Sequence, residues 1–171
     1  TLDVGVGSGV AVGGGASVTT EQADSQTTPS LPQALSTYQS AAAYYDNVNI
    51  KLREAAGNQI EVVKASNGNN EAYVNNGSII YVYGNSKSIE IDEDNFSRTV
   101  TLICEDEDII ISGDNITITP AVQNTMMYAG DTVNVTGNYF TGSGIIKSVG
   151  SMTISGTNAT VSNASVWSNG S

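Results

Sequence analysis

The sequence of 171 residues is long enough for one domain, or for one domain with a terminal arm, and it contains no histidine. The chain therefore lacks the commonest general base and the commonest zinc ligand, which excludes most hydrolase and metalloenzyme mechanisms. Six Lys and Arg residues against 17 Asp and Glu residues give a formal net charge of −11. Binding to nucleic acid or to an anionic membrane needs a basic face, so neither is expected.

Composition and the start of the chain favour a location outside the cell. Charged residues make up 13% of the sequence, and Asn, Ser, Thr and Gly are abundant, as is typical of secreted and virion surface proteins. No run of 18 apolar residues predicts a membrane-spanning helix. Thr1 is the start expected of a mature chain after removal of a signal peptide, although loss of an initiator methionine would leave the same residue. We expect an extracellular or cell-surface protein, with a virion as the alternative.

The first 20 residues are predicted to form a strand-like arm. Small hydrophobic residues recur at every second position, and glycine fills most of the positions between them. A glycine-rich terminal strand loses much conformational entropy on ordering, so it needs a partner sheet. We expect the arm to dock as a donated strand in a neighbouring subunit, with docking in its own subunit as the alternative. The expected interface residues are Leu2, Val4, Val6, Val10 and Val12.

Residues 21–30 are polar and end in a proline turn, which predicts a linker between the arm and the body. Residues 31–45 then show hydrophobic residues at steps of three and four behind a fair N-cap, Ser30. This pattern predicts one short N-terminal helix. A single all-β domain is expected to occupy residues 31–171, including this helix.

From residue 48 onward the hydrophobic period is two, and turns rich in Asn and Gly separate short strands. Residues 48–83 have the spacing of hairpins, which favours a β-sandwich of the Greek-key or jelly-roll kind. Residues 109–167 contain strands of three to five residues between Gly-Asn and Gly-Asp corners, and these resemble the rungs of a parallel β-solenoid. The sequence predicts an all-β body and leaves both architectures open.

Eight of the 17 acidic residues lie in two clusters, at residues 90–94 and 105–108. Closely packed carboxylates suit Ca²⁺, which takes six to eight oxygen ligands. Neither cluster has the register of a calcium loop, and acidic turns also keep sheet edges from mispairing. A structural calcium ion is the one cofactor considered, with Asp92, Asp94, Asp106 and Asp108 as candidate ligands.

Seven Asn-x-Ser/Thr sequons occur, where the composition alone predicts about four. The excess suggests glycosylation of a secreted surface. The last sequon begins at Asn169, close to the end of the sequence. The candidate glycosylation sites are Asn76, Asn95, Asn115, Asn134, Asn158 and Asn163.

No constellation of catalytic residues is recognisable, and the one cysteine, Cys104, lies in an apolar run and is interpreted as a buried hydrophobic residue. We therefore expect a non-enzymatic structural protein. The leading hypothesis is the subunit of an extracellular, pilus-like filament that joins copies of itself by N-terminal strand donation. The alternative is a capsid decoration or fibre subunit that binds a viral capsid protein through the same arm, and a glycan-binding adhesin module is third.

Overall fold

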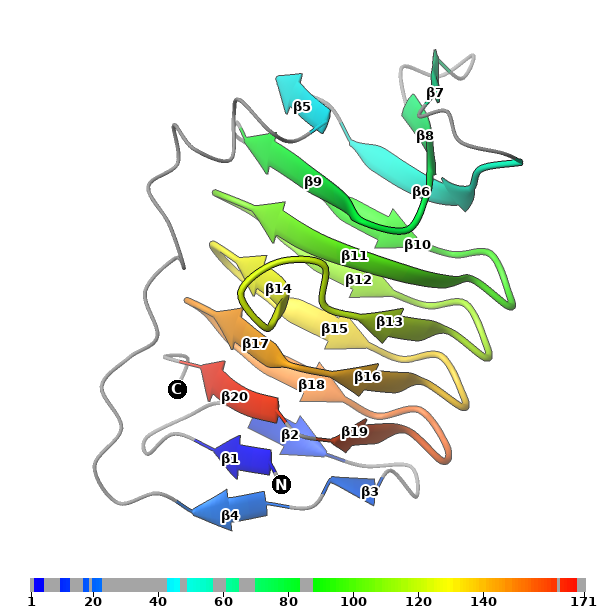
Figure 1. Cartoon of the computed structure of the whole chain (residues 1–171). Helices are drawn as coiled ribbons and strands as arrows, with labels where there is room; N and C mark the ends of the chain where they lie inside the picture. Colours follow the sequence, from blue (N-terminus) through cyan, green and yellow to red (C-terminus); the bar gives the residue numbers. More distant parts are fainter. Residues whose placement is uncertain are drawn as a thin grey trace.

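The chain folds into a β-solenoid of short stacked strands (Figure 1). Every regular element that is described is a strand, which confirms the all-β prediction, and the parallel stacking agrees with the solenoid of the two expected architectures. The computed structural model describes residues 2–4, 10–12, 17–18, 20–22, 43–46, 49–56, 61–64, 70–83, 88–162 and 164–168.

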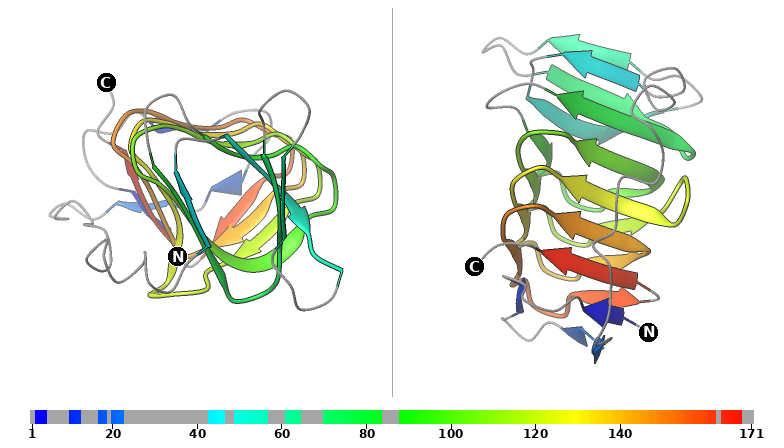
Figure 2. Two further views of the ribbon diagram at one scale, coloured as in Figure 1. Left: turned by 90° about the horizontal axis from the view of Figure 1, so that it is seen from above. Right: turned by 90° about the vertical axis from the view of Figure 1, so that its left-hand side faces the viewer.

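Three sheets, here called A, B and C, form the sides of the solenoid (Figure 2). Sheet A contains, from one end to the other, β4 (Thr20–Gln22), β1 (Leu2–Val4), β20 (Ala164–Ser168), β17 (Ile145–Ser148), β14 (Thr125–Ala129), β11 (Ser97–Cys104), β9 (Ser78–Tyr83) and β5 (Ala43–Asp46). Sheet B contains β2 (Val10–Val12), β18 (Met152–Ile154), β15 (Val133–Val135), β12 (Ile109–Ile111), β10 (Ile89–Ile91), β6 (Ile50–Glu54), β8 (Asn70–Val74) and β7 (Glu61–Lys64). Sheet C contains β3 (Ser17–Val18), β19 (Thr160–Ser162), β16 (Thr141–Ser143), β13 (Thr117–Thr119) and the first part of β11, which continues into sheet A.

Each rung visits the sheets in the order B, C, A. The successive rungs are β12–β13–β14, β15–β16–β17 and β18–β19–β20, and corresponding strands pair in parallel. Among the described strands, β7 with β8 is the one antiparallel pair. Hydrogen bonds between rungs therefore run along the axis of the stack, and each residue lies above its counterpart in the rung before.

One expectation from the sequence lies mostly outside the described residues, and another is corrected in part. Of the helix predicted over residues 31–45, the first twelve residues lie outside the described part, and the rest belong to β5, which pairs in parallel with β9. Of the hairpins expected within residues 48–83, the one between β7 and β8 is confirmed, because these two strands pair antiparallel. The expected hairpin of β6 with β7 is wrong, because β6 pairs in parallel with β8 and β10, and β8 and β9 lie in different sheets instead of forming a hairpin. Asn and Gly in this region mark solenoid corners as well as they would mark tight hairpins.

The core is a set of hydrophobic columns that run along the axis. Inward residues of sheet B stack in register over four rungs, and the corners after them each contribute one more buried residue. Full burial of one such side chain stabilises the fold by about 1.5–3 kcal/mol. The columns are Ile89–Ile109–Val133–Met152, Ile91–Ile111–Val135–Ile154 and Phe96–Ile116–Phe140–Ala159, all at most 2% exposed.

The corner between sheets B and C repeats in four rungs, at residues 92–96, 112–116, 136–140 and 155–159. Its fourth residue has a left-handed backbone, with φ near 60°, and is Asn in three of the four rungs. Asn tolerates this conformation better than most residues do. The third residue links the rungs, because Oδ1 of Asp94 accepts a hydrogen bond from the Asp114 N–H at 2.8 Å, and Oδ1 of Asp114 accepts one from the Asn138 N–H at 2.8 Å.

The second residue of this corner must be glycine wherever an equivalent corner lies beneath it. A Cβ atom on Gly137 would overlap the carbonyl oxygen of Gly113, and one on Gly156 would overlap that of Gly137. In the first of these rungs the equivalent position holds Glu93, on whose carbonyl Gly113 packs in turn. The close approach of successive backbones thus explains the glycines of the second half of the chain.

Substitution of Gly137 by alanine tests this close approach. We expect Gly137→Ala to lower the free energy of unfolding by about 3 kcal/mol, at the upper end of the usual range for overpacking, because a backbone carbonyl cannot move aside as a side chain can. The matched control is Thr136→Ala at the exposed neighbouring position, which should stay within about 0.5 kcal/mol of the wild type. Urea unfolding measures both, and equal stability of Gly137→Ala and the wild type would contradict the stacking of these corners.

Candidate functional site

The N-terminal strands lie on the C-terminal end of the solenoid (Figure 1). β1 pairs in parallel with β20, β2 with β18 and β3 with β19, and β4 then pairs with β1. These four strands, here called the N-terminal rung (residues 2–4, 10–12, 17–18 and 20–22), add to all three sheets of the same chain. Residues 2–4 and residues 164–166 are therefore neighbours, although the solenoid between them is many rungs long.

The hydrophobic row of the predicted arm is in register with the core columns. Val10 pairs with Met152 and Val12 with Ile154, which are both fully buried, and Val4 pairs with Val166. Leu2 pairs with Ala164, whereas Val6 lies outside the described residues. Four of the five predicted interface residues thus occupy positions of a solenoid rung, and their role between subunits stays a prediction.

The sequence of the N-terminal rung matches that of a body rung. Val10 follows Val4 by six positions in the sequence. Met152 follows Ile146 by the same six positions, and Ile146 lies in β17, two strands from β1 in sheet A. Gly14 follows Val12 by two residues, as Gly156 follows Ile154. Glycine is required at the second residue of the body corners, so a glycine-rich arm is the composition that a further rung needs.

A pocket of about 420 Å³ lies near the other end of the stack, where β6, β8 and the first B–C corner meet. Arg53 lies among its carboxylates, with its Nε 3.2 Å from Glu93 and its Nη2 3.6 Å from Glu71. The Tyr73 hydroxyl donates to Glu71 at 3.2 Å. The lining residues are Arg53, Glu54, Glu71, Tyr73, Glu93, Asp94, Asn95 and Phe96.

Asp92 joins β6 to the corner after β10 through two cations. Its Oδ1 accepts from Arg53 Nη1 at 2.6 Å, and its Oδ2 accepts from Lys51 Nζ at 3.1 Å. Burial raises the pKa of the Asp92 carboxyl, but the hydrogen bonds from Arg53 and Lys51 outweigh it and hold that pKa below its ordinary value. Lys51 and Arg53 neutralise the Asp92 carboxylate, so an acidic residue at this position is explained without a bound metal ion.

The four candidate calcium ligands do not meet at one place. Asp92 follows β10 and Asp108 precedes β12, and since these strands pair in parallel register, the two carboxylates lie at opposite ends of the pair. Asp94 accepts the Asp114 N–H, and Asp106 lies in the corner of Asp108. The two acidic clusters of the sequence therefore form two separate corners, and calcium binding stays a prediction.

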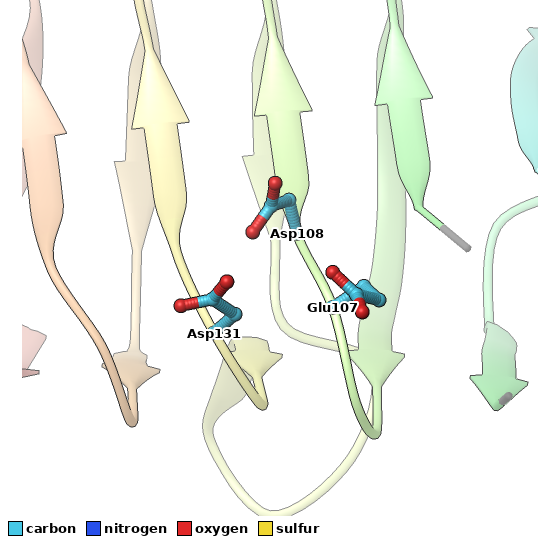
Figure 3. A group of neighbouring side chains, drawn as sticks. All are labelled: Glu107, Asp108 and Asp131. Atoms are coloured by element: carbon cyan, nitrogen blue, oxygen red, sulfur yellow. The ribbon is translucent and has the colours of Figure 1, made fainter. Parts of the chain in front are cut away.

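One of those residues, Asp108, belongs to another acidic group with Glu107 and Asp131 from the next rung (Figure 3). One carboxylate oxygen from each of the three lies within 4.8 Å of the others. Asp108 Oδ1 also accepts from the N–H and the hydroxyl of Thr132, at 3.0 and 2.7 Å. Three carboxylates are fewer ligands than Ca²⁺ takes, so waters would have to complete such a site.

The sequons follow from the solenoid repeat. Asn95, Asn115 and Asn158 are each the left-handed residue of a corner, followed by a buried hydrophobic residue and by the first Ser or Thr of sheet C. The Asn115 amide donates to Oδ1 of Asn95 at 2.8 Å. Oδ1 of Asn76 accepts the Thr99 N–H at 2.8 Å, and Asn134 donates to the Thr132 hydroxyl at 3.3 Å. Asn163 lies outside the described residues, and glycosylation at any of these sites stays a prediction.

Cys104 is 1% exposed, and burial raises the pKa of its thiol to about 12. The expectation of a buried hydrophobic cysteine is confirmed. Within the described residues, no helix is long and apolar enough to cross a membrane. Comparisons with models of known protein families, with curated proteins and with solved structures found no match. The function therefore has to be argued from the geometry of this chain.

The ion pairs of Asp92 give a stability that depends on pH. We expect Asp92→Asn to lower the free energy of unfolding by about 1–2 kcal/mol at pH 7, because the negative charge is lost and an amide N–H₂ replaces one of the two acceptor oxygens. The folded pKa of Asp92 is lowered, so its contribution is present above the ordinary Asp pKa of about 3.9 and is lost as the pH falls through the lowered folded pKa.

Glu93→Gln is the matched control, since Glu93 contacts the same Arg53 but its side chain is 59% exposed. We expect a loss below about 0.5 kcal/mol for this variant. Urea unfolding at a series of pH values compares both variants with the wild type. A difference for Asp92→Asn that persists unchanged below the folded pKa would contradict the assignment.

Proposed function

We propose that the protein is a non-enzymatic structural subunit of an extracellular filament, and that the N-terminal rung joins one copy to the next. The observation that carries the proposal is the place of residues 2–22 on the far end of their own solenoid. The N-terminal rung covers β18, β19 and β20, from which it is far in sequence. The same rung could therefore cover these three strands on another copy of the protein. The chain's lack of histidine and its buried Cys104 support a structural rather than a catalytic role.

The N-terminal rung would make the same contacts whether it docks on its own chain or on a neighbouring copy. The N-terminal rung would pair with β18, β19 and β20 in either case, so exchange between copies changes little besides the path of the connecting chain. Local concentration then decides between the two forms, because a tethered rung competes with rungs of other molecules. Assembly is therefore expected to increase with protein concentration.

The connecting chain is long enough for both arrangements. Between β4 and β5 lie residues 23–42, which can span about 70 Å when extended. Seven strand spacings in sheet A separate these two strands, a distance of about 33 Å. Removal of most of this segment should therefore prevent docking on the own chain and leave docking on a neighbour allowed.

The two ends of sheet A also have compatible directions. The sheet ends in β4 on one side and in β5 on the other, and all strands between them pair in parallel. A second copy placed end to end would therefore bring its β5 beside β4 in the same direction, and one continuous parallel sheet would cross the junction. This geometry produces head-to-tail growth rather than a closed dimer.

Deletion of residues 24–38 tests the proposal. The six remaining steps from Gln22 to Ala43 reach about 20 Å, which is too short for docking on the own chain. We expect the shortened protein to form filaments at concentrations where the wild type is largely monomeric, as seen by sedimentation velocity and negative-stain electron microscopy.

The matched control replaces residues 24–38 by a Gly-Ser segment of equal length, which keeps the reach and should behave as the wild type does. Both proteins are examined by circular dichroism so that loss of folding is recognised. A shortened protein that is folded and stays monomeric at every concentration would overturn exchange of the N-terminal rung.

A further inference from the structure

The outward face of sheet C carries two columns of hydroxyl residues that run across the rungs. Strand registers align Ser97 with Thr117, Thr141 and Thr160, and the column continues at Ser17 of the N-terminal rung. Two residues further along each strand, Thr99 aligns with Thr119, and Ser143 with Ser162. Every outward position of this sheet that the structure describes is therefore Ser or Thr.

These side chains stand on a rigid base. The residues between them are Ile118, Gly142 and Val161, which are buried, and Arg98, which is half-buried and whose guanidinium donates to the carbonyl groups of Val74 and Ala55. The outward hydroxyl residues whose side chains are described are half-buried or exposed, and Thr99 and Thr119 share a hydrogen bond of 2.7 Å between their hydroxyls. Ladders of this kind keep a sheet flat and fix the side chains in one rotamer.

The columns form a lattice with two repeats. Neighbouring rungs are about 4.8 Å apart, and residues two positions apart along a strand are about 6.6 Å apart. Seen along the axis, successive rungs lie almost over one another, so the columns follow the stack (Figure 2). A flat array with fixed repeats in two directions is suited to a partner that is itself periodic.

The chemistry of the array is neutral and hydrogen-bonding. Each hydroxyl donates one hydrogen bond and accepts others, and threonine adds a methyl group beside it. No outward position of sheet C in the described strands is charged or aromatic. A charge would impose its own hydration shell, whereas a lattice of water oxygens needs neighbours that both donate and accept.

We propose that the outer face of sheet C binds the surface of ice. Ice is a neutral lattice of groups that donate and accept hydrogen bonds, and the array offers the same groups at regular spacing. A crystalline polysaccharide is the other periodic partner of this kind, but its recognition would use aromatic side chains stacked on sugar rings. The corners beside sheet C contribute one exposed aromatic residue, Tyr139, in four rungs, which favours ice.

Thermal hysteresis and the shape of ice crystals in solutions of the purified full chain test the proposal. We expect the wild type to separate the freezing from the melting temperature and to produce faceted crystals. Thr119→Lys and Thr141→Lys each place a flexible charge in the exposed array, on different rungs, and each should abolish both effects. Two variants are used so that one remains informative if the other fails to fold by circular dichroism.

Thr153→Lys is the matched control, because Thr153 points outward from the middle of sheet B at a half-buried position. This variant should keep the activity of the wild type. Absence of thermal hysteresis and of ice shaping in the wild type would overturn the proposal, as would full activity of both array variants. Co-sedimentation with microcrystalline cellulose and chitin completes the test, since retention there without activity on ice would assign the face to polysaccharide instead.

Discussion

The structure depends on the close parallel stacking of backbones from one rung to the next. Strands of one rung donate and accept hydrogen bonds with the rungs on both sides, so each position of the repeat becomes a column along the axis. Several columns then favour one class of residue. Corners admit glycine where a carbonyl group lies beneath, inward positions admit hydrophobic residues, and the left-handed corner position favours asparagine. The same constraint extends the hydroxyl columns of sheet C over several rungs.

Such a stack is open at its ends, and different kinds of strand cover the two ends of this solenoid. At one end, β7 pairs in antiparallel direction with β8 and interrupts the parallel pattern of sheet B. At the other end, the N-terminal rung continues all three sheets in the parallel direction. An end covered by the antiparallel strand resists extension of sheet B, whereas an end covered by the N-terminal rung would allow extension if, as proposed, that rung exchanges between copies. The proposed filament and the proposed ice-binding face share only Ser17 of the N-terminal rung, so each stands without the other.

The sequence predicted the all-β class and the solenoid character of residues 109–167, because short strands and Gly-Asn corners recur there. It predicted the antiparallel pair of β7 and β8 but not the pairing of β6 and β9, since Asn75-Asn76-Gly77 marks a bend between sheets as readily as a hairpin. The hydroxyl columns were missed because their members lie 20, 24 and 19 residues apart, from Ser97 to Thr160, so unequal corners hide the repeat. The alternation of the arm was recognised, but sequence alone could not show that its valines continue the core of the last rung.

The central claim is that residues 2–22 form a rung on the C-terminal end of a solenoid, and engineered disulfides test it most directly. Asp3 and Ser165 are register partners on neighbouring strands, so Asp3→Cys with Ser165→Cys should oxidise readily, whereas Asp3→Cys with Trp167→Cys lies two residues out of register. Native Cys104 does not interfere, because it is buried. We expect efficient cross-linking of the first pair on non-reducing gels, within one chain when dilute and between chains when concentrated. Equal cross-linking of the two pairs, or none in either, would contradict the claim.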